Sequence, residues 1–187
     1  MKSVTSFALR WMALLITVVS CVFAQPAHAS KQGWADASDV GAYTLMAASV
    51  VIPAVKGDGK GVLQAAGTFA AASLVTEGLK EAFPTLRPDG SDRRSFPSGH
   101  TSRSFAAAAS LWQRQGKEIG IPAMAIAGMV GVARMKADKH RFGEVAVGAA
   151  IGLASGLLIT NKPKESTTTL VPWTDGKGGG VSFAMRF

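Results

Sequence analysis

Residues 121–160 read IPAMAIAGMVGVARMKADKHRFGEVAVGAAIGLASGLLIT, and this stretch decides the fold class. It contains two apolar runs rich in Ala and Gly, at 121–135 and 142–160, on either side of a charged segment at 136–141. Apolar runs of this length are typical of helices rather than of strands. We therefore expect two helices joined by a short charged loop.

Three further apolar runs precede this pair, at 40–55, 62–83 and 98–112. The first follows Asp36-Ala37-Ser38-Asp39, a cluster of residue types that cap helices. The second ends at Pro84, which the interior of a helix does not tolerate, and the third has Ser98 at its cap. The sequence thus predicts an all-α fold, a five-helix bundle over residues 30–164, with no convincing internal strand.

The two ends of the chain differ from this body. Residues 1–29 combine a positively charged start with a short apolar run and small residues at its end, so we expect a signal peptide that is cleaved before Ser30. An uncleaved anchor helix, or a lipid attached at Cys21, are the alternatives. Residues 165–187 are rich in Thr and Gly and end in an alternating pattern, which predicts a β-hairpin packed on the body. An outer-membrane barrel signal that ends in Phe187 is the alternative, disfavoured because one hairpin cannot close a barrel.

The chain is strongly basic. Its 187 residues suit one domain, and 20 Lys and Arg residues against 12 Asp and Glu residues give a formal charge of +8. Such a charge favours an anionic partner: a nucleic acid, a phospholipid surface or a phosphorylated substrate. Cys21 is the single cysteine, which excludes a disulfide framework within the chain.

The predicted helices are compatible with a membrane. Runs of about 16 residues cover about 24 Å of a hydrocarbon core about 30 Å thick, and small residues suit close packing between membrane helices. If the first helix enters from outside, every inner connection is basic, as membrane topology favours. These connections hold Lys56 and Lys60, Arg114 and Lys117, and Lys162 and Lys164. We favour a membrane-embedded bundle over a soluble or peripheral exported one.

Three segments carry groups that bind or attack a phosphate. In chain order they are Lys80 with Arg87, then Pro97-Ser98-Gly99-His100, then Arg134 with His140 and Glu144. An arginine grips two phosphate oxygens at once and a lysine acts as a point charge. Backbone N–H groups at the start of a helix point outward with the positive end of its dipole, and a glycine there lets a phosphate approach closely.

His100 and His140 are the histidines that remain after cleavage. Glu144 lies one helical turn after His140, so its carboxylate can reach one ring nitrogen. That contact would hold the tautomer and leave the other nitrogen free to attack, as in a catalytic triad. A solvated His–Glu pair and ordinary surface bases are the alternatives.

The ordered set Lys80-x6-Arg87-Pro88, Pro97-Ser98-Gly99-His100 and Arg134-x5-His140-x3-Glu144 resembles the signature of the type 2 phosphatidic acid phosphatase and haloperoxidase superfamily. The motifs span residues 80–144, and the number of helices agrees over the rest of the body. Two positions depart from the family pattern. Ala133 stands where the family usually has Ser, and Glu144, one methylene longer, stands where it usually has Asp.

The resemblance implies a role for each matched residue. His140 is the nucleophile and forms a phosphohistidine, Glu144 orients it, and His100 protonates the leaving oxygen and later activates water. The phosphate oxygens are held by Lys80, Arg87, Ser98, Gly99 and Arg134. Fixed cations and amides can stabilise a phosphoryl transition state without a metal, so we expect neither a metal nor another cofactor.

The expected function is hydrolysis of a phosphate or diphosphate monoester, carried by a membrane lipid, at an inner-membrane site that faces the periplasm. Phosphatidic acid, phosphatidylglycerol phosphate, undecaprenyl diphosphate, lipid A and small phosphomonoesters are all candidate substrates. The alternatives are a vanadate-dependent haloperoxidase and a phosphate-binding relative without turnover. A nucleic-acid protein is disfavoured because no aromatic stripe accompanies the basic residues.

Overall fold

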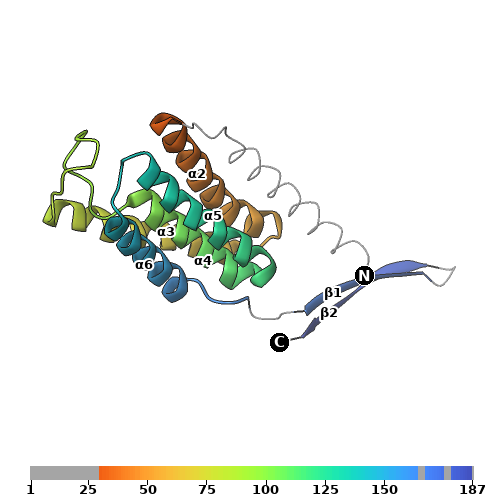
Figure 1. Cartoon of the computed structure of the whole chain (residues 1–187). Coiled ribbons are helices and arrows are strands. Elements are labelled where there is room, and N and C mark those ends of the chain that lie inside the picture. The colour runs from red at the N-terminus through yellow and green to blue at the C-terminus, as the bar shows by residue number, and fades with distance from the viewer. Residues whose placement is uncertain (1–29, 164–166, 175–177, 187) are drawn as a thin grey trace.

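The structure is a computed structural model, and it describes residues 30–163, 167–174 and 178–186. Within these ranges five helices precede a two-stranded hairpin (Figure 1). The elements are α2 (Lys31–Val55), α3 (Gly59–Ala82), α4 (Gly99–Gln115), α5 (Lys117–Lys136), α6 (Phe142–Ile159), β1 (Thr167–Thr174) and β2 (Gly179–Arg186). The predicted all-α, five-helix fold is confirmed. The predicted signal peptide at 1–29 lies outside the described residues.

Three helices begin earlier than the sequence pattern predicts, and one of them is α3, which begins at Gly59 rather than at residue 62. α2 begins at Lys31 rather than at residue 40, because Ser30 caps it by accepting the N–H of Gly33 through Oγ at 3.0 Å. α5 begins at Lys117 rather than at residue 121, directly after Gly116, whose φ of 79° ends α4. The predicted starts were wrong because the first residues of these helices are helical although they do not continue the apolar runs.

α4 is the central helix of the bundle and packs against each of the other four. Its four consecutive alanines at 106–109 are fully buried. Three glycines of α6, Gly148, Gly152 and Gly156, face it so closely that a Cβ at Gly152 would lie 2.2 Å from the carbonyl oxygen of Ser102. Small residues on both helices therefore bring the start of α6 next to the start of α4.

Four of the helices, α2, α3, α5 and α6, are long and apolar enough to cross a membrane. Their 18 to 25 residues span about 27–37 Å, enough for a hydrocarbon core. Large apolar side chains are exposed on their outer surfaces, among them Val55, Leu63, Leu74 and Leu158. Lipid chains would cover such a surface, and the chain is a membrane protein.

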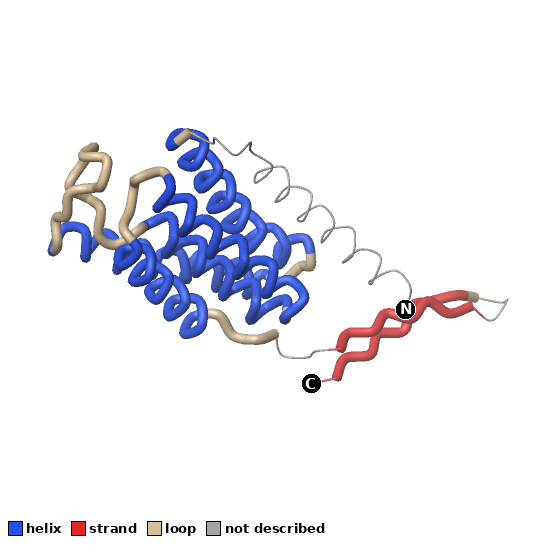
Figure 2. Tube along the Cα trace, viewed as in Figure 1, coloured by secondary structure: helices blue, strands red, loops and turns tan. Residues whose placement is uncertain are grey.

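The connections alternate between the two ends of the bundle. The loop from α3 to α4 and the loop from α5 to α6 lie at the same end (Figure 2). The hairpin pairs β1 with β2 in antiparallel register, from Thr167 opposite Arg186 to Thr174 opposite Gly179. It lies beyond the helices in Figure 1, so the prediction that it packs on the body was wrong.

Candidate active site

All the candidate residues of the three motifs lie at one end of the bundle, where the loops 83–98 and 137–141 meet. Lys80 and Arg134 stand in the last turns of α3 and α5, and His100 and Glu144 in the first turns of α4 and α6. The ends of α3, α4, α5 and α6 thus position these charged groups, and the distances between the groups depend on how the four helices pack.

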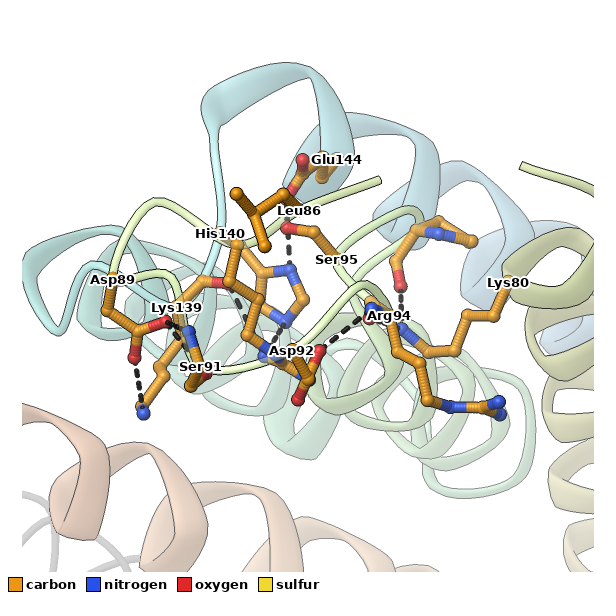
Figure 3. Close-up of polar contacts among 12 residues, drawn as sticks. Lys80, Leu86, Asp89, Ser91, Asp92, Arg94, Ser95, Lys139, His140 and Glu144 are labelled. Atoms are coloured by element: carbon orange, nitrogen blue, oxygen red, sulfur yellow. Dashed lines mark hydrogen bonds and ion pairs between the residues drawn. The ribbon is translucent and has the colours of Figure 1, made fainter. Parts of the chain in front are cut away.

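His140 is held between the carboxylate of Glu144, labelled with it in Figure 3, and the guanidinium of Arg87. Its Nδ1 lies 3.1 Å from Oε2 of Glu144, and its Nε2 lies 3.3 Å from Nη1 of Arg87. Glu144 accepts from an N–H, so the proton of the neutral ring belongs on Nδ1 and the lone pair on Nε2. The nitrogen free to attack therefore faces a guanidinium that can bind a phosphate.

The environment of His140 keeps its ring neutral. Burial, together with the guanidinium groups of Arg87 and Arg134, lowers the pKa of His140 to about 3, and the hydrogen bond to Glu144 opposes this shift. A neutral imidazole retains the lone pair that a nucleophile needs.

The carboxylate of Glu144 is fixed by more than the imidazole. Its Oε2 accepts the hydroxyl of Ser95 at 2.5 Å and the backbone N–H of Arg141 at 3.0 Å, and its Oε1 accepts from Nη1 of Arg141 at 3.3 Å. The contact to the Arg141 backbone is that of a capping-box glutamate at the start of α6. Ser95 is fully buried, and sequence reasoning missed it because it belongs to no motif.

Arg87 and Arg134 approach the site from different sides. Arg87 is anchored by Nε on Oδ1 of Asp92 at 2.8 Å, and its Nη1 also reaches the carbonyl of Lys139 at 3.3 Å. Arg134 is buried, and its Nη1 donates to Oγ of Ser38 at 3.2 Å. Its Nε is buried and has no hydrogen-bond partner among the residues that the structure describes.

His100 has a partner that the motifs do not contain. Its Nε2 lies 2.9 Å from Oδ1 of Asp39, a residue of α2, and that oxygen is also 3.6 Å from Nη1 of Arg134. The edge of Tyr43 packs on the ring, with 6.4 Å between ring centroids. No sequence signal separates Asp39 from Asp36, the other acidic residue of α2, because the contact of Asp39 spans 61 positions of the chain.

The side chains of Lys80 and Ser98 form hydrogen bonds to other groups of the protein. Nζ of Lys80 donates to the carbonyls of Arg94 at 2.6 Å and Pro97 at 2.7 Å. Oγ of Ser98 makes no capping bond but accepts from Thr101 at 2.9 Å. Gly99 begins α4, where the first N–H groups lack acceptors within the helix. Lys80 therefore holds the loop that precedes Gly99 through two backbone carbonyls of that loop.

Three more arginines are near this end of the bundle. Arg94 binds Glu77 at 2.6 Å and also pairs with Glu81. Nε of Arg103 donates to the carbonyl of Gly99 at 3.1 Å, and one of its Nη atoms lies where a Cβ on Gly99 would come within 3.0 Å. Arg93 is exposed. Of the three, Arg103 lies directly beside the start of α4.

The donor set of the site suits an anion. Arg87, Arg134 and Lys80 all act electrostatically on His140, and Arg87 and Arg134 also act on His100, so both imidazoles share the same cations. Among the described residues, no three His, Cys, Asp or Glu side chains gather into a group that could hold a metal ion. The arrangement places cations that can bind an anion beside the nucleophilic nitrogen of His140.

Two curated proteins are similar to this chain. The chain is 30% identical over 141 residues to Lipid A 4'-phosphatase of Helicobacter pylori, which covers 65% of this chain and 71% of that protein. It is 33% identical over 100 residues to Lipid A 1-phosphatase of Porphyromonas gingivalis, covering 52% of this chain and 22% of that protein. The chain therefore spans about a fifth of the second relative's length.

A solved structure has the same fold. The crystal structure of LpxE from Aquifex aeolicus superposes with a TM-score of 0.60 over 76% of this chain and 92% of that chain, at 21% identity. The family model described as the PAP2 superfamily matches residues 61–167, which include every motif residue from Lys80 to Glu144. The chain belongs to the PAP2 superfamily.

Proposed function

We propose that this protein hydrolyses a phosphate monoester carried by a membrane lipid, through a phosphohistidine on His140. Its family and its lipid A phosphatase relatives make it a phosphoric monoester hydrolase. The observation that carries the mechanism is the placement of His140, with Nδ1 on Glu144 and Nε2 beside Arg87. The curated relatives favour a phosphate of lipid A among the candidate substrates.

In the first step, Nε2 of His140 attacks phosphorus while Arg87, Arg134 and the N–H groups at Gly99 hold the phosphoryl oxygens. The charge of a loose phosphoryl transition state spreads over three oxygens, which fixed cations stabilise. The bond from phosphorus to the ester oxygen breaks, and His100 supplies the proton to that oxygen. In the second step, His100 takes a proton from the water that cleaves the phosphohistidine.

The departure of Glu144 from the family's usual Asp agrees with this role. The longer side chain reaches Nδ1 of His140 while it also caps α6 and accepts from Ser95. We expect turnover to be retained because all three contacts orient the carboxylate. The second departure, Ala133, is fully buried in α5, and nothing in the structure explains it.

The site is expected to face the periplasm. The basic connections Lys56 with Lys60, and Arg114 with Lys117, lie at the end of the bundle opposite the site, as expected for the cytoplasmic side. Residues 1–29 would then act as the export signal, and residues 30–164 as the phosphatase domain. A lipid phosphate in the outer leaflet could reach the site from the side of the bundle.

The test is phosphate release from a panel of lipids by the purified protein in detergent, with the His140→Ala variant as the control. Lipid A, phosphatidic acid and phosphatidylglycerol phosphate form the panel, and undecaprenyl diphosphate represents the diphosphates. We expect release from at least one lipid, no release by His140→Ala, and an acid-labile phosphoprotein in the wild type alone. Full activity of folded His140→Ala would overturn the mechanism.

The same panel tests the requirement for a metal. Because cations of the protein surround the site, we expect activity to persist in EDTA. Activity that vanishes with EDTA and returns with magnesium would contradict this part of the proposal.

A further inference from the structure

α2 contributes an acidic side chain to the site although it lies before the matched segment of the family, which begins at residue 61. Asp39 stands in the third turn of α2 and contacts His100, with 2.9 Å between Oδ1 and Nε2. The inference below rests on the proposed role of His100 as the proton donor.

The contact of Asp39 with His100 is specific to one oxygen. Oδ1 is buried, although the residue as a whole is half-exposed, and it has no aligned hydrogen bond in the described structure. A buried carboxylate oxygen without a hydrogen bond is costly unless a charge compensates it. A positively charged His100 ring, with Arg134 at 3.6 Å, would provide that compensation.

The other charges around His100 oppose its protonation. Arg134 from α5, Arg103 from α4 and Arg87 from the loop after α3 all disfavour a positive ring, and burial acts in the same direction. Asp39 from α2 favours it, but the balance of these effects lowers the pKa of His100 to about 4. A general acid must carry a proton when the leaving oxygen departs, so a site rich in guanidinium groups needs a carboxylate beside its acid to oppose them.

We propose that Asp39 is a positioning residue that raises the proton affinity of His100 against the surrounding cations and holds its ring turned for proton transfer to the leaving oxygen. The proton on Nε2 stays on the ring beside Asp39, and the proton on Nδ1 goes to the ester oxygen, which receives the electron pair of the breaking bond to phosphorus. The ring is then neutral with its lone pair on Nδ1. It takes a proton from water when the phosphohistidine is cleaved, which restores the starting state.

The experiment compares two substrates whose leaving oxygens differ in basicity. 4-Nitrophenyl phosphate has a good leaving group that needs little protonation, and hexyl phosphate has a poor one that depends on the acid. For Asp39→Asn we expect kcat on hexyl phosphate to fall about 10–100-fold and kcat on 4-nitrophenyl phosphate to fall less than about threefold, with KM little changed. The basic limb of the pH profile should move to lower pH, because the protonated ring is less favoured.

A matched control is available one helical turn earlier. Asp36 is exposed and hydrogen-bonded to Gln32 at 2.7 Å, so Asp36→Asn should leave both substrates unaffected. Asp39→Ser provides a second variant if Asp39→Asn folds poorly, as judged by circular dichroism. Equal losses on both substrates would overturn the proposal, and so would tighter binding, which would mean that Asp39 competes with phosphate for Arg134.

His100→Asn separates this inference from the proposed function. It should show the same dependence on the leaving group, and adding Asp39→Asn to it should cause no further loss. If His100→Asn slows both substrates equally, the role of His100 as an acid fails. If His100→Asn shows the dependence and Asp39→Asn does not, the inference about Asp39 fails alone.

Discussion

The carboxylate of Glu144 lies 3.1 Å from Nδ1 of His140 and caps the same helix turn through the backbone N–H of Arg141 at 3.0 Å. Orientation of the nucleophile and the start of α6 thus depend on one side chain. We therefore expect a substitution at Glu144 to lower kcat more than it lowers the stability of the bundle.

Glu144→Gln tests this dependence. The amide has no charge to match the imidazolium and can present an N–H to Nδ1, which favours the wrong tautomer of His140. We expect kcat to fall about 10²–10⁴-fold, as for the equivalent change in a catalytic triad, with a smaller change in KM. Steady-state kinetics on the best lipid of the panel measures this loss. Glu81→Gln, an exposed glutamate paired with Arg94, serves as the control. Unchanged kcat in Glu144→Gln would show that His140 is oriented by another group.

Ser95→Ala removes the shortest hydrogen bond to Glu144, at 2.5 Å. A hydrogen bond to a charged group is worth about 1.5–3 kcal/mol, so a loss of about tenfold or more in kcat is expected if the bond holds the carboxylate in place. The control is Ser91→Ala in the same loop, where the side chain is exposed and binds Asp89. Similar kinetics for the two variants would remove Ser95 from the site.

The motif residues were predictable from sequence because each lies within a few positions of a helix end. Lys80, Arg87, Gly99, Arg134 and Glu144 stand at or near the ends of apolar runs, and such ends meet when antiparallel helices pack. The number of helices followed from the same runs. Spacing alone placed Glu144 one turn from His140, and the structure has them in contact.

Asp39 and Ser95 were not predictable, because their partners are far along the chain. Asp39 meets His100 through the packing of α2 against α4, and Ser95 meets Glu144 across 49 positions. Single-sequence patterns contain no information on such pairs. The early start of α2 at Lys31 was missed for a different reason: its first turns are polar, and their helical structure depends on the cap at Ser30.

The low pKa of His140 predicts how activity depends on pH. Its ordinary value of 6.5 is lowered to about 3, so the neutral nucleophile is present above that pH and is lost only in strong acid. Removing one of the guanidinium groups that lower this pKa should raise it and move the acid limb of kcat/KM to higher pH. We expect the acid limb of Arg87→Gln to lie at higher pH than that of the wild type. Both proteins are measured on the same substrate, so ionisation of the substrate affects both profiles equally.

The control for this pH experiment is Arg93→Gln, which removes an exposed arginine from the same loop. Its acid limb should coincide with that of the wild type. If Arg87→Gln loses activity at every pH without a shift of the limb, Arg87 binds substrate but does not set the protonation of His140.

The proposed orientation can be tested with single cysteines in a Cys21→Ser background. Ser91 is exposed in the loop at the site, and Lys117 is exposed at the other end of the bundle. A maleimide that cannot cross membranes should label Ser91→Cys in intact spheroplasts and Lys117→Cys only after lysis. The reverse pattern would place the site in the cytoplasm, and labelling of both in sealed cells would mean that the bundle does not span the membrane.

The contact between α4 and α6 should limit both stability and activity. A Cβ at Gly152 would lie 2.2 Å from the carbonyl oxygen of Ser102 and 2.8 Å from the backbone nitrogen of Ala106. Gly152→Ala must therefore push the two helices apart, and overpacking of this kind costs about 1–3 kcal/mol. We expect a lower unfolding temperature in detergent.

Gly128→Ala is the matched control, since a Cβ at this glycine of α5 meets nothing within 4 Å. Alanine in an open helical position should leave stability unchanged or raise it by up to about 1 kcal/mol. The Gly152 variant should also lose activity, because the start of α6 is tied to α4 by the bond from the N–H of Ser98 to the carbonyl of Glu144, at 3.1 Å. If Gly152→Ala unfolds earlier but keeps full kcat below its unfolding temperature, helix spacing stabilises the bundle without setting the position of the catalytic carboxylate.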